Sequence, residues 1–190
     1  MTVRWFNMFG ALAVVVCAAT TIALAASSPK IESTPIPAPG KPDFSSMNFS
    51  LGTWMCSTKS GRRPGPYITT SVTTMDPTGY FMVTKSTTAK TSWAPKAGAT
   101  DWVTWDSDTK RWVDINVGDF GSYDASTSPG WTGNTMVWTD ALFKPGMDVV
   151  AVTPLINTKV SDTKLTSHTT FKERSSGRWI SVDTVCNKTM

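Results

Sequence analysis

The sequence contains little of what most catalytic and metal-binding sites need. It has one histidine, His168, among 190 residues, and it has no Gly-x-Ser-x-Gly motif. A Ser/His/acid hydrolase needs a base beside an exposed nucleophile, so only this histidine could serve. The acidic segments 106–108 and 114–116 do not complete the ligand pattern of a calcium loop. We therefore expect no metal site and favour a protein that is not an enzyme.

Charged residues are also sparse, at 17% of the chain, with 18 basic and 14 acidic side chains. The basic residues are scattered and form no concentrated stripe of the kind that binds nucleic acid. No segment carries apolar residues at the i, i+3, i+4 and i+7 spacing, which excludes a helical bundle. We expect no nucleic-acid partner, and the sequence leaves the oligomeric state open.

The one long hydrophobic run lies at the N-terminus, from Met8 to Leu24. Arg4 precedes it, and a small-x-small pattern at residues 23–25 ends it, as in a secretory signal peptide. We predict that residues 1–25 are a signal peptide cleaved before Ala26. The mature protein would then be secreted or periplasmic and would have no membrane span.

This cleavage reduces the number of cysteines from three to two. Cys17 leaves with the signal peptide, and lipidation there is not favoured because the preceding valines lack the expected small residue. Cys56 and Cys186 remain, and an even pair in an oxidising compartment predicts a disulfide. Two buried free thiols are the alternative.

Proline marks the domain boundary. Residues 26–43 contain five prolines and predict an extended, semi-rigid linker. The remainder, residues 44–190, is long enough for one domain with a core.

This domain is rich in β-branched and aromatic residues between turn signals, which is typical of strands. Turn signatures such as Asp76-Pro77-Thr78-Gly79 and Ser175-Ser176-Gly177, together with other short links, imply antiparallel neighbours. A disulfide between the first and last strands would close the sheet. We therefore predict an all-β fold: a single antiparallel up-and-down barrel of about ten strands. The predicted strands are residues 50–58, 67–75, 80–88, 101–105, 111–117, 120–126, 134–142, 147–154, 163–174 and 178–187.

The hairpin around Asp108-Thr109 predicts which side chains lie inside. If these residues form the tip, Trp105 lies opposite Trp112, and Trp102 shares a face with Ile115. Alternation then separates residues 113, 115 and 117 from residues 112, 114 and 116. We expect the apolar set Val113, Ile115 and Val117 to face the barrel interior.

The segment Gly52-Thr53-Trp54 opens the first predicted strand. Gly52 tolerates a bend where the strand enters a barrel, and Trp54 can close the narrow end. This arrangement resembles the calycin superfamily of lipocalins and fatty-acid-binding proteins. Segments 105–112 and 130–138 look similar to a bacterial family of secreted, calycin-like domains with no assigned function. The sequence departs from these families by lacking an evident C-terminal helix or a helical lid.

Eight tryptophans remain after signal removal, and they favour a barrel that binds a small apolar or aromatic molecule. We assign its wall to Trp54, Trp102, Val113, Ile115 and Val117. The alternative is a solidly packed structural or interaction module. That alternative predicts an exposed apolar patch and surface exposure of Trp93 and Trp131.

Two further possibilities follow from the resemblance. Some calycin-like barrels, the nitrobindin-like haem proteins, ligate haem iron with one histidine, which would be His168 here. We do not favour haem, because the rest of that motif is missing, and we expect no cofactor. Other calycin-like barrels catalyse isomerisations, which would require Asp114, Asn116 or His168 to converge inside a cavity.

Overall fold

The structure is a computed structural model that describes residues 37–144 and 148–189. The predicted signal peptide, Cys17 and most of the predicted linker lie outside this part of the chain. Within it, strands dominate, and two short 3-10 helices, η1 and η2, accompany them. The elements are η1 (Ser45–Ser50), β1 (Gly52–Ser60), β2 (Tyr67–Met75), β3 (Met82–Thr88), β4 (Ala97–Asp106), β5 (Arg111–Gly118), η2 (Asp119–Gly121), β6 (Tyr123–Ser128), β7 (Trp131–Thr132), β8 (Thr135–Lys144), β9 (Val149–Val152), β10 (Leu155–Ser161), β11 (Lys164–Glu173) and β12 (Trp179–Lys188).

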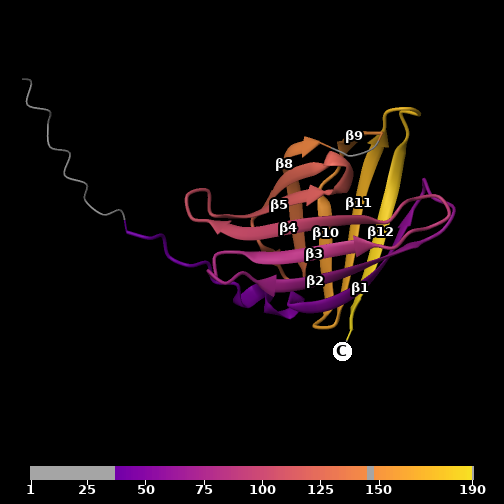
Figure 1. Cartoon of the computed structure of the whole chain (residues 1–190). Helices are drawn as coiled ribbons and strands as arrows, with labels where there is room; N and C mark the ends of the chain where they lie inside the picture. Colours follow the sequence, from indigo (N-terminus) through magenta and orange to yellow (C-terminus); the bar gives the residue numbers. More distant parts are fainter. Residues whose placement is uncertain (1–36, 145–147, 190) are drawn as a thin grey trace, which may run out of the picture. The chain divides into compact units, whose positions relative to one another are not determined.

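Ten of these strands form a closed antiparallel barrel. Strands β1 to β6 pair in chain order, β6 pairs with β8, and β8 pairs with β10. Strands β10, β11 and β12 then follow, and β12 pairs with β1, which completes the ring. Figure 1 shows β2 to β5 running across β10 to β12, so that two walls of the barrel cross. The predicted fold class is confirmed.

The disulfide lies where the ring closes. Cys56 on β1 is directly opposite Cys186 on β12, and their sulfurs are bonded. This confirms the predicted bridge between the first and last strands. A disulfide is also consistent with an extracytoplasmic location.

One strand of the ring was not predicted. The predicted strand 147–154 yields only β9, which pairs with β11 outside the ring, whereas β10 takes the place in the barrel. Strand β10 is hard to recognise because its inward positions include the polar residues Asn157 and Lys159. Met147, the first residue of that predicted strand, lies outside the described residues.

The base of the barrel is closed by two groups of side chains. Trp54 is buried beside the disulfide, and its indole N–H donates to the Ser50 carbonyl at 2.8 Å. Helix η1 holds Phe44 and Met47 against the larger core cluster, with the Phe44 and Trp112 rings 5.3 Å apart. The predicted closure by Trp54 is therefore accompanied by a helical turn that the sequence analysis missed.

The register of the β4–β5 hairpin is as predicted, but its facing is the reverse. Trp105 is opposite Trp112, and Trp102 is opposite Ile115. However, Trp112 is buried, while Ile115 and Val117 are 41% and 49% exposed. The expectation that the apolar set faces inward is wrong, because the interior above Trp112 is polar.

No helix among the described residues is long and apolar enough to span a membrane.

Candidate functional site

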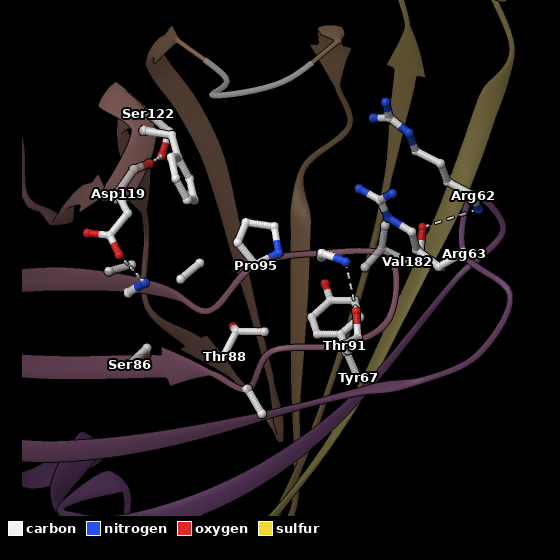
Figure 2. Close-up of a pocket in the computed structure, with 18 of the residues that line it drawn as sticks. Arg62, Arg63, Tyr67, Ser86, Thr88, Thr91, Pro95, Asp119, Ser122 and Val182 are labelled. Atoms are coloured by element: carbon white, nitrogen blue, oxygen red, sulfur yellow. Dashed lines mark hydrogen bonds between the residues drawn. The ribbon is translucent and has the colours of Figure 1, made fainter.

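The candidate site is a pocket at the end of the barrel opposite η1. In an antiparallel ring, alternate connections lie at the same end. The β1–β2 loop, the β3–β4 loop and η2 therefore meet there, as Figure 2 shows. They surround a cavity of about 410 Å³ that is partly open to solvent. This volume suits a small organic ligand.

The pocket is lined mainly by aromatic and small apolar side chains. The aromatic residues are Tyr67 at the start of β2, Trp93 in the β3–β4 loop, Phe120 in η2 and Phe171 on β11. The rings of Tyr67 and Trp93 meet edge to face at 5.9 Å, an arrangement that aromatic pairs favour. The pocket thus offers flat, apolar surfaces to a ligand.

A short hydrogen-bonded turn positions Trp93. The Thr91 hydroxyl accepts hydrogen bonds from the backbone N–H groups of Trp93 at 3.3 Å and Ala94 at 2.9 Å. The Thr91 N–H donates to the Ala94 carbonyl at 2.9 Å. Threonine side chains commonly bond nearby backbone in this way and so stabilise turns. Hydrogen bonds within residues 91–94 therefore fix the backbone that carries the Trp93 indole at the pocket.

The η2 turn presents Phe120 in an unusual conformation. Phe120 has φ 63° and ψ 18°, in the left-handed region that bulky residues rarely adopt. Its side chain is 64% exposed although it lines the pocket. The turn is fixed on both sides, because the Gly118 N–H donates to the Ser122 carbonyl and the Gly98 N–H donates to Asp119 Oδ2 at 2.6 Å. A strained, exposed aromatic side chain in a pocket is typical of a binding surface.

Two arginines of the β1–β2 loop line the pocket on the other side. Arg62 is paired with Glu173 at 2.9 Å and with Asp148 at 3.4 Å. The guanidinium of Arg63 lies 4.8 Å from the centre of the Trp93 ring. The pocket therefore combines an apolar surface with cationic groups at one rim.

The floor of the pocket is polar. Ser86 and Asn116 line it from β3 and β5. Hydroxyl pairs on β2 and β3 bond to each other, among them Ser71 with Ser86 at 2.9 Å. The Asn116 amide donates to Asp101 Oδ1 at 2.5 Å, and burial raises the pKa of Asp101. Inward polar groups are thus largely satisfied by neighbours across the strands.

Asp114 is one of the exceptions among the inward polar groups of the described residues. Burial raises its pKa to about 8, and the charges of Asp101 and Asp124 act in the same direction. Its Oδ1 has no hydrogen-bond partner. A carboxyl group in this environment is neutral at pH 7, because ionisation in a poorly solvated site costs free energy.

None of the five residues assigned to the ligand-binding wall lines this pocket. Trp54 lies at the opposite, closed end of the barrel. Trp102 shares the outer face of the β4–β5 hairpin with Val113, Ile115 and Val117. The pocket was not predicted, because many of its residues lie in loops at the strand ends, whereas the predicted wall lies along the strands.

A usable signal was nevertheless present in the sequence. Trp93 stands in the turn-rich segment after the third predicted strand, whereas Phe120 was placed at the start of the sixth predicted strand, residues 120–126. In a meander, the loops after odd-numbered strands share one end of the barrel. This spacing places Trp93 at the same end of the barrel as the Arg62-Arg63 pair, which follows the first predicted strand.

His168 lies on the outer wall and does not face the pocket. Its Nδ1 is 2.7 Å from Asp183 Oδ1, and nearly half of its side chain is exposed. The Ser181 hydroxyl donates to Asp183 rather than to the imidazole. This geometry lacks the contact between nucleophile and base that a hydrolase needs.

The polar residues considered for an isomerase do not converge either. Asp114 and Asn116 face inward, whereas His168 is outside. Within the described residues, no group of three or more histidine, cysteine or carboxylate side chains is arranged to hold a metal ion.

Comparisons with known proteins give information on the fold but none on the function. No protein-family model and no curated protein matches the chain. The structure of Rv2717c from M. tuberculosis is similar, with a TM-score of 0.55 and 13% identity over 77% of this chain and 97% of that one. A protein of unknown function from the DUF3598 family of Nostoc punctiforme PCC 73102 has a TM-score of 0.34 and 15% identity, over 84% of this chain and 53% of that one. The likeness to Rv2717c supports the barrel fold alone, and membership of the calycin superfamily stays a prediction.

Proposed function

We propose that this protein binds a small apolar or aromatic molecule non-covalently at the open end of its barrel. The supporting observation is the cavity of about 410 Å³ whose wall includes an exposed Phe120 in a left-handed conformation. Folding alone gains nothing from exposing a phenylalanine ring in strained backbone. A ligand that covers this ring and the facing Trp93 would supply the missing contact.

The ligand would enter between aromatic side chains on opposite sides of the cavity. Tyr67 lies on one side of the cavity and Ser122 on the other (Figure 2). The Trp93 ring contacts Tyr67, and Phe120 belongs to the η2 turn that precedes Ser122. Small apolar residues such as Ala97 and Pro95 also line the cavity. A flat ring system fits this space best, because aromatic faces give large contact areas for little lost entropy.

The test is a titration with N-phenyl-1-naphthylamine, a neutral aromatic probe whose fluorescence rises in apolar surroundings. We expect saturable binding by the wild-type protein. Trp93→Ala should weaken the affinity about tenfold, since an aromatic contact of this kind contributes about 1–1.5 kcal/mol. Trp179→Ala is the matched control, because Trp179 is an exposed tryptophan on the outer face of β12. Absence of saturable binding, or equal losses in both variants, would overturn the proposal.

A second candidate is an interaction module, and the outer wall supplies an observation in its favour. Ile115, Val117 and Leu142 are exposed on β5 and β8. Ile115 and Leu142 both pair with Ala125 of β6, so they lie in one row across the sheet. Exposed apolar side chains on neighbouring strands can form a contact surface. Sedimentation of the wild type and of an Ile115→Ser/Val117→Ser variant tests whether this row joins two copies.

A further inference from the structure

The two neighbouring arginines at the pocket differ in how they are paired. Arg62 forms ion pairs with Asp148 and Glu173, so its charge is offset locally. Within the part of the chain that the structure describes, the Arg63 guanidinium forms no ion pair. The guanidinium lies 4.8 Å from the centre of the Trp93 ring, and the backbone N–H of Arg63 donates to the Ser60 carbonyl. Among the described residues, Arg63 is therefore a cation at the pocket without an acidic partner.

The surrounding charges leave this rim positive. Besides the Ser175 hydroxyl, the charges of Arg62 and Arg174 help to lower the pKa of Asp148. Three arginines thus stand near two acids, Asp148 and Glu173. The charge of Arg63 also reaches into the pocket: burial raises the pKa of Tyr67, and Arg63 opposes that rise. A negative group arriving here would meet a net positive potential.

The contact between Arg63 and Trp93 is a cation–π contact, which needs no acceptor for the hydrogen-bond donors of the guanidinium. The N–H groups point outward along its edges, in a fork that matches the two oxygens of a carboxylate, sulfonate or phosphate. The Thr91 turn positions Trp93, so the Arg63 guanidinium rests on an indole ring whose backbone is held in place. An anionic group could bind there in bidentate fashion.

The opposite side of the pocket carries a negative charge. Asp119 lines it from η2, and Figure 2 shows this side chain across the cavity from Arg63. Asp119 Oδ2 accepts a hydrogen bond from the Gly98 N–H, which fixes the carboxylate at the rim. An anion on this side would be repelled. The two charges therefore favour one orientation of a charged ligand over the other.

We propose that the ligand is a small aromatic or apolar acid, whose anionic group binds Arg63 while its apolar body reaches across the pocket toward Phe120. This inference rests on the proposed function and specifies its ligand class. It does not require a covalent step or a cofactor. A carboxylate, sulfonate or phosphate ester would share the same recognition chemistry.

The experiment compares two probes that share a ring system and differ in one charged group. N-phenyl-1-naphthylamine is neutral, and 1-anilinonaphthalene-8-sulfonate carries a sulfonate on the same scaffold. Wild-type protein should bind the sulfonate several-fold more tightly than the neutral probe. Arg63→Gln should weaken sulfonate binding about tenfold, since a charge-assisted hydrogen bond is replaced by a neutral one. It should change binding of the neutral probe by less than twofold.

Three further variants complete the test. Lys85→Gln removes one positive charge from the exposed outer wall at β3 and should leave both affinities unchanged. Arg63→Lys keeps the charge without the fork and should retain part of the preference. Asp119→Asn should strengthen sulfonate binding, because it removes the opposing charge.

The outcomes separate this inference from the proposed function. If the neutral probe binds and Arg63→Gln leaves the ratio of the two affinities unchanged, the proposal of an acidic ligand is refuted. The proposal that the pocket binds an apolar molecule is then retained. The same conclusion follows if Arg63→Gln weakens both probes equally, because Arg63 would then only support Trp93. If neither probe binds the wild type, both proposals fail.

Discussion

Replacing Asp114 by asparagine should make the protein more stable at neutral pH and flatten its dependence of stability on pH. The Asp114 carboxyl has a pKa of about 8 in the folded protein, against 3.8 in an unfolded chain. Between these values the folded protein binds one proton more than the unfolded chain. By linkage, the free energy of unfolding then falls by about 1.4 kcal/mol for each unit of rising pH.

The magnitude at pH 7 follows from the same two values. About three units separate pH 7 from the unfolded pKa, which corresponds to a cost of about 4 kcal/mol. Relaxation of the site and water entry reduce such costs, so we expect Asp114→Asn to gain about 2–4 kcal/mol at pH 7. At pH 4 the carboxyl is protonated in the folded state and half protonated in the unfolded chain. The two proteins should therefore differ little there.

The assay is urea unfolding of the disulfide-bonded protein at several pH values between 4 and 8. Asp108→Asn, in the exposed β4–β5 loop, is the control for loss of an aspartate, and it should follow the wild type at every pH. Asp101 retains its own contribution, because burial raises its pKa as well. If Asp114→Asn and wild type lose stability in parallel as the pH rises, Asp114 is not a buried neutral acid and the reasoning is refuted.

Further predictions concern the Cys56–Cys186 disulfide and the η2 turn. Replacing Cys56 and Cys186 by serine should lower the free energy of unfolding by up to about 5 kcal/mol, because the bridge spans 130 residues, and denaturant unfolding with and without a reductant would show it. A loss below 1 kcal/mol would mean that strand pairing alone closes the ring. Phe120→Gly should raise stability by about 1 kcal/mol by relieving the left-handed conformation, yet weaken binding of the neutral probe. Gly121→Ala, also at positive φ, should instead destabilise the turn, and a gain in thermal stability there would contradict the strain argument.

Much of the fold could be predicted because its signals are local. Turn residues at 76–79 and 175–177 mark hairpin ends, and β-branched runs mark most strands. The two cysteines sit in the first and last strands, so their pairing indicated the closed ring before any coordinates. Strand β10 could not be predicted in the same way, since its inward polar residues give a weak hydrophobic pattern.

The candidate site was less accessible from the sequence. The assignment of Val113, Ile115 and Val117 to the interior assumed that the apolar face of a strand is the buried one. In this barrel Asp114 and Asn116 face inward, and the Asn116 amide donates to Asp101 on the neighbouring strand, whereas Asp114 is buried with its Oδ1 unpaired. Alternation fixes which residues share a face, but it does not say which face is inside.

The sequence by itself determined the strand-rich meander, the register of the β4–β5 hairpin and the covalent link between the chain's first and last strands. These depend on turn chemistry and on residue type, which act over a few positions or through one bond. Only the tertiary structure decided that Trp93, Phe120 and Arg63 meet around one cavity. They come from loops separated by tens of residues, and closure of the ring is what brings those loops to the same rim.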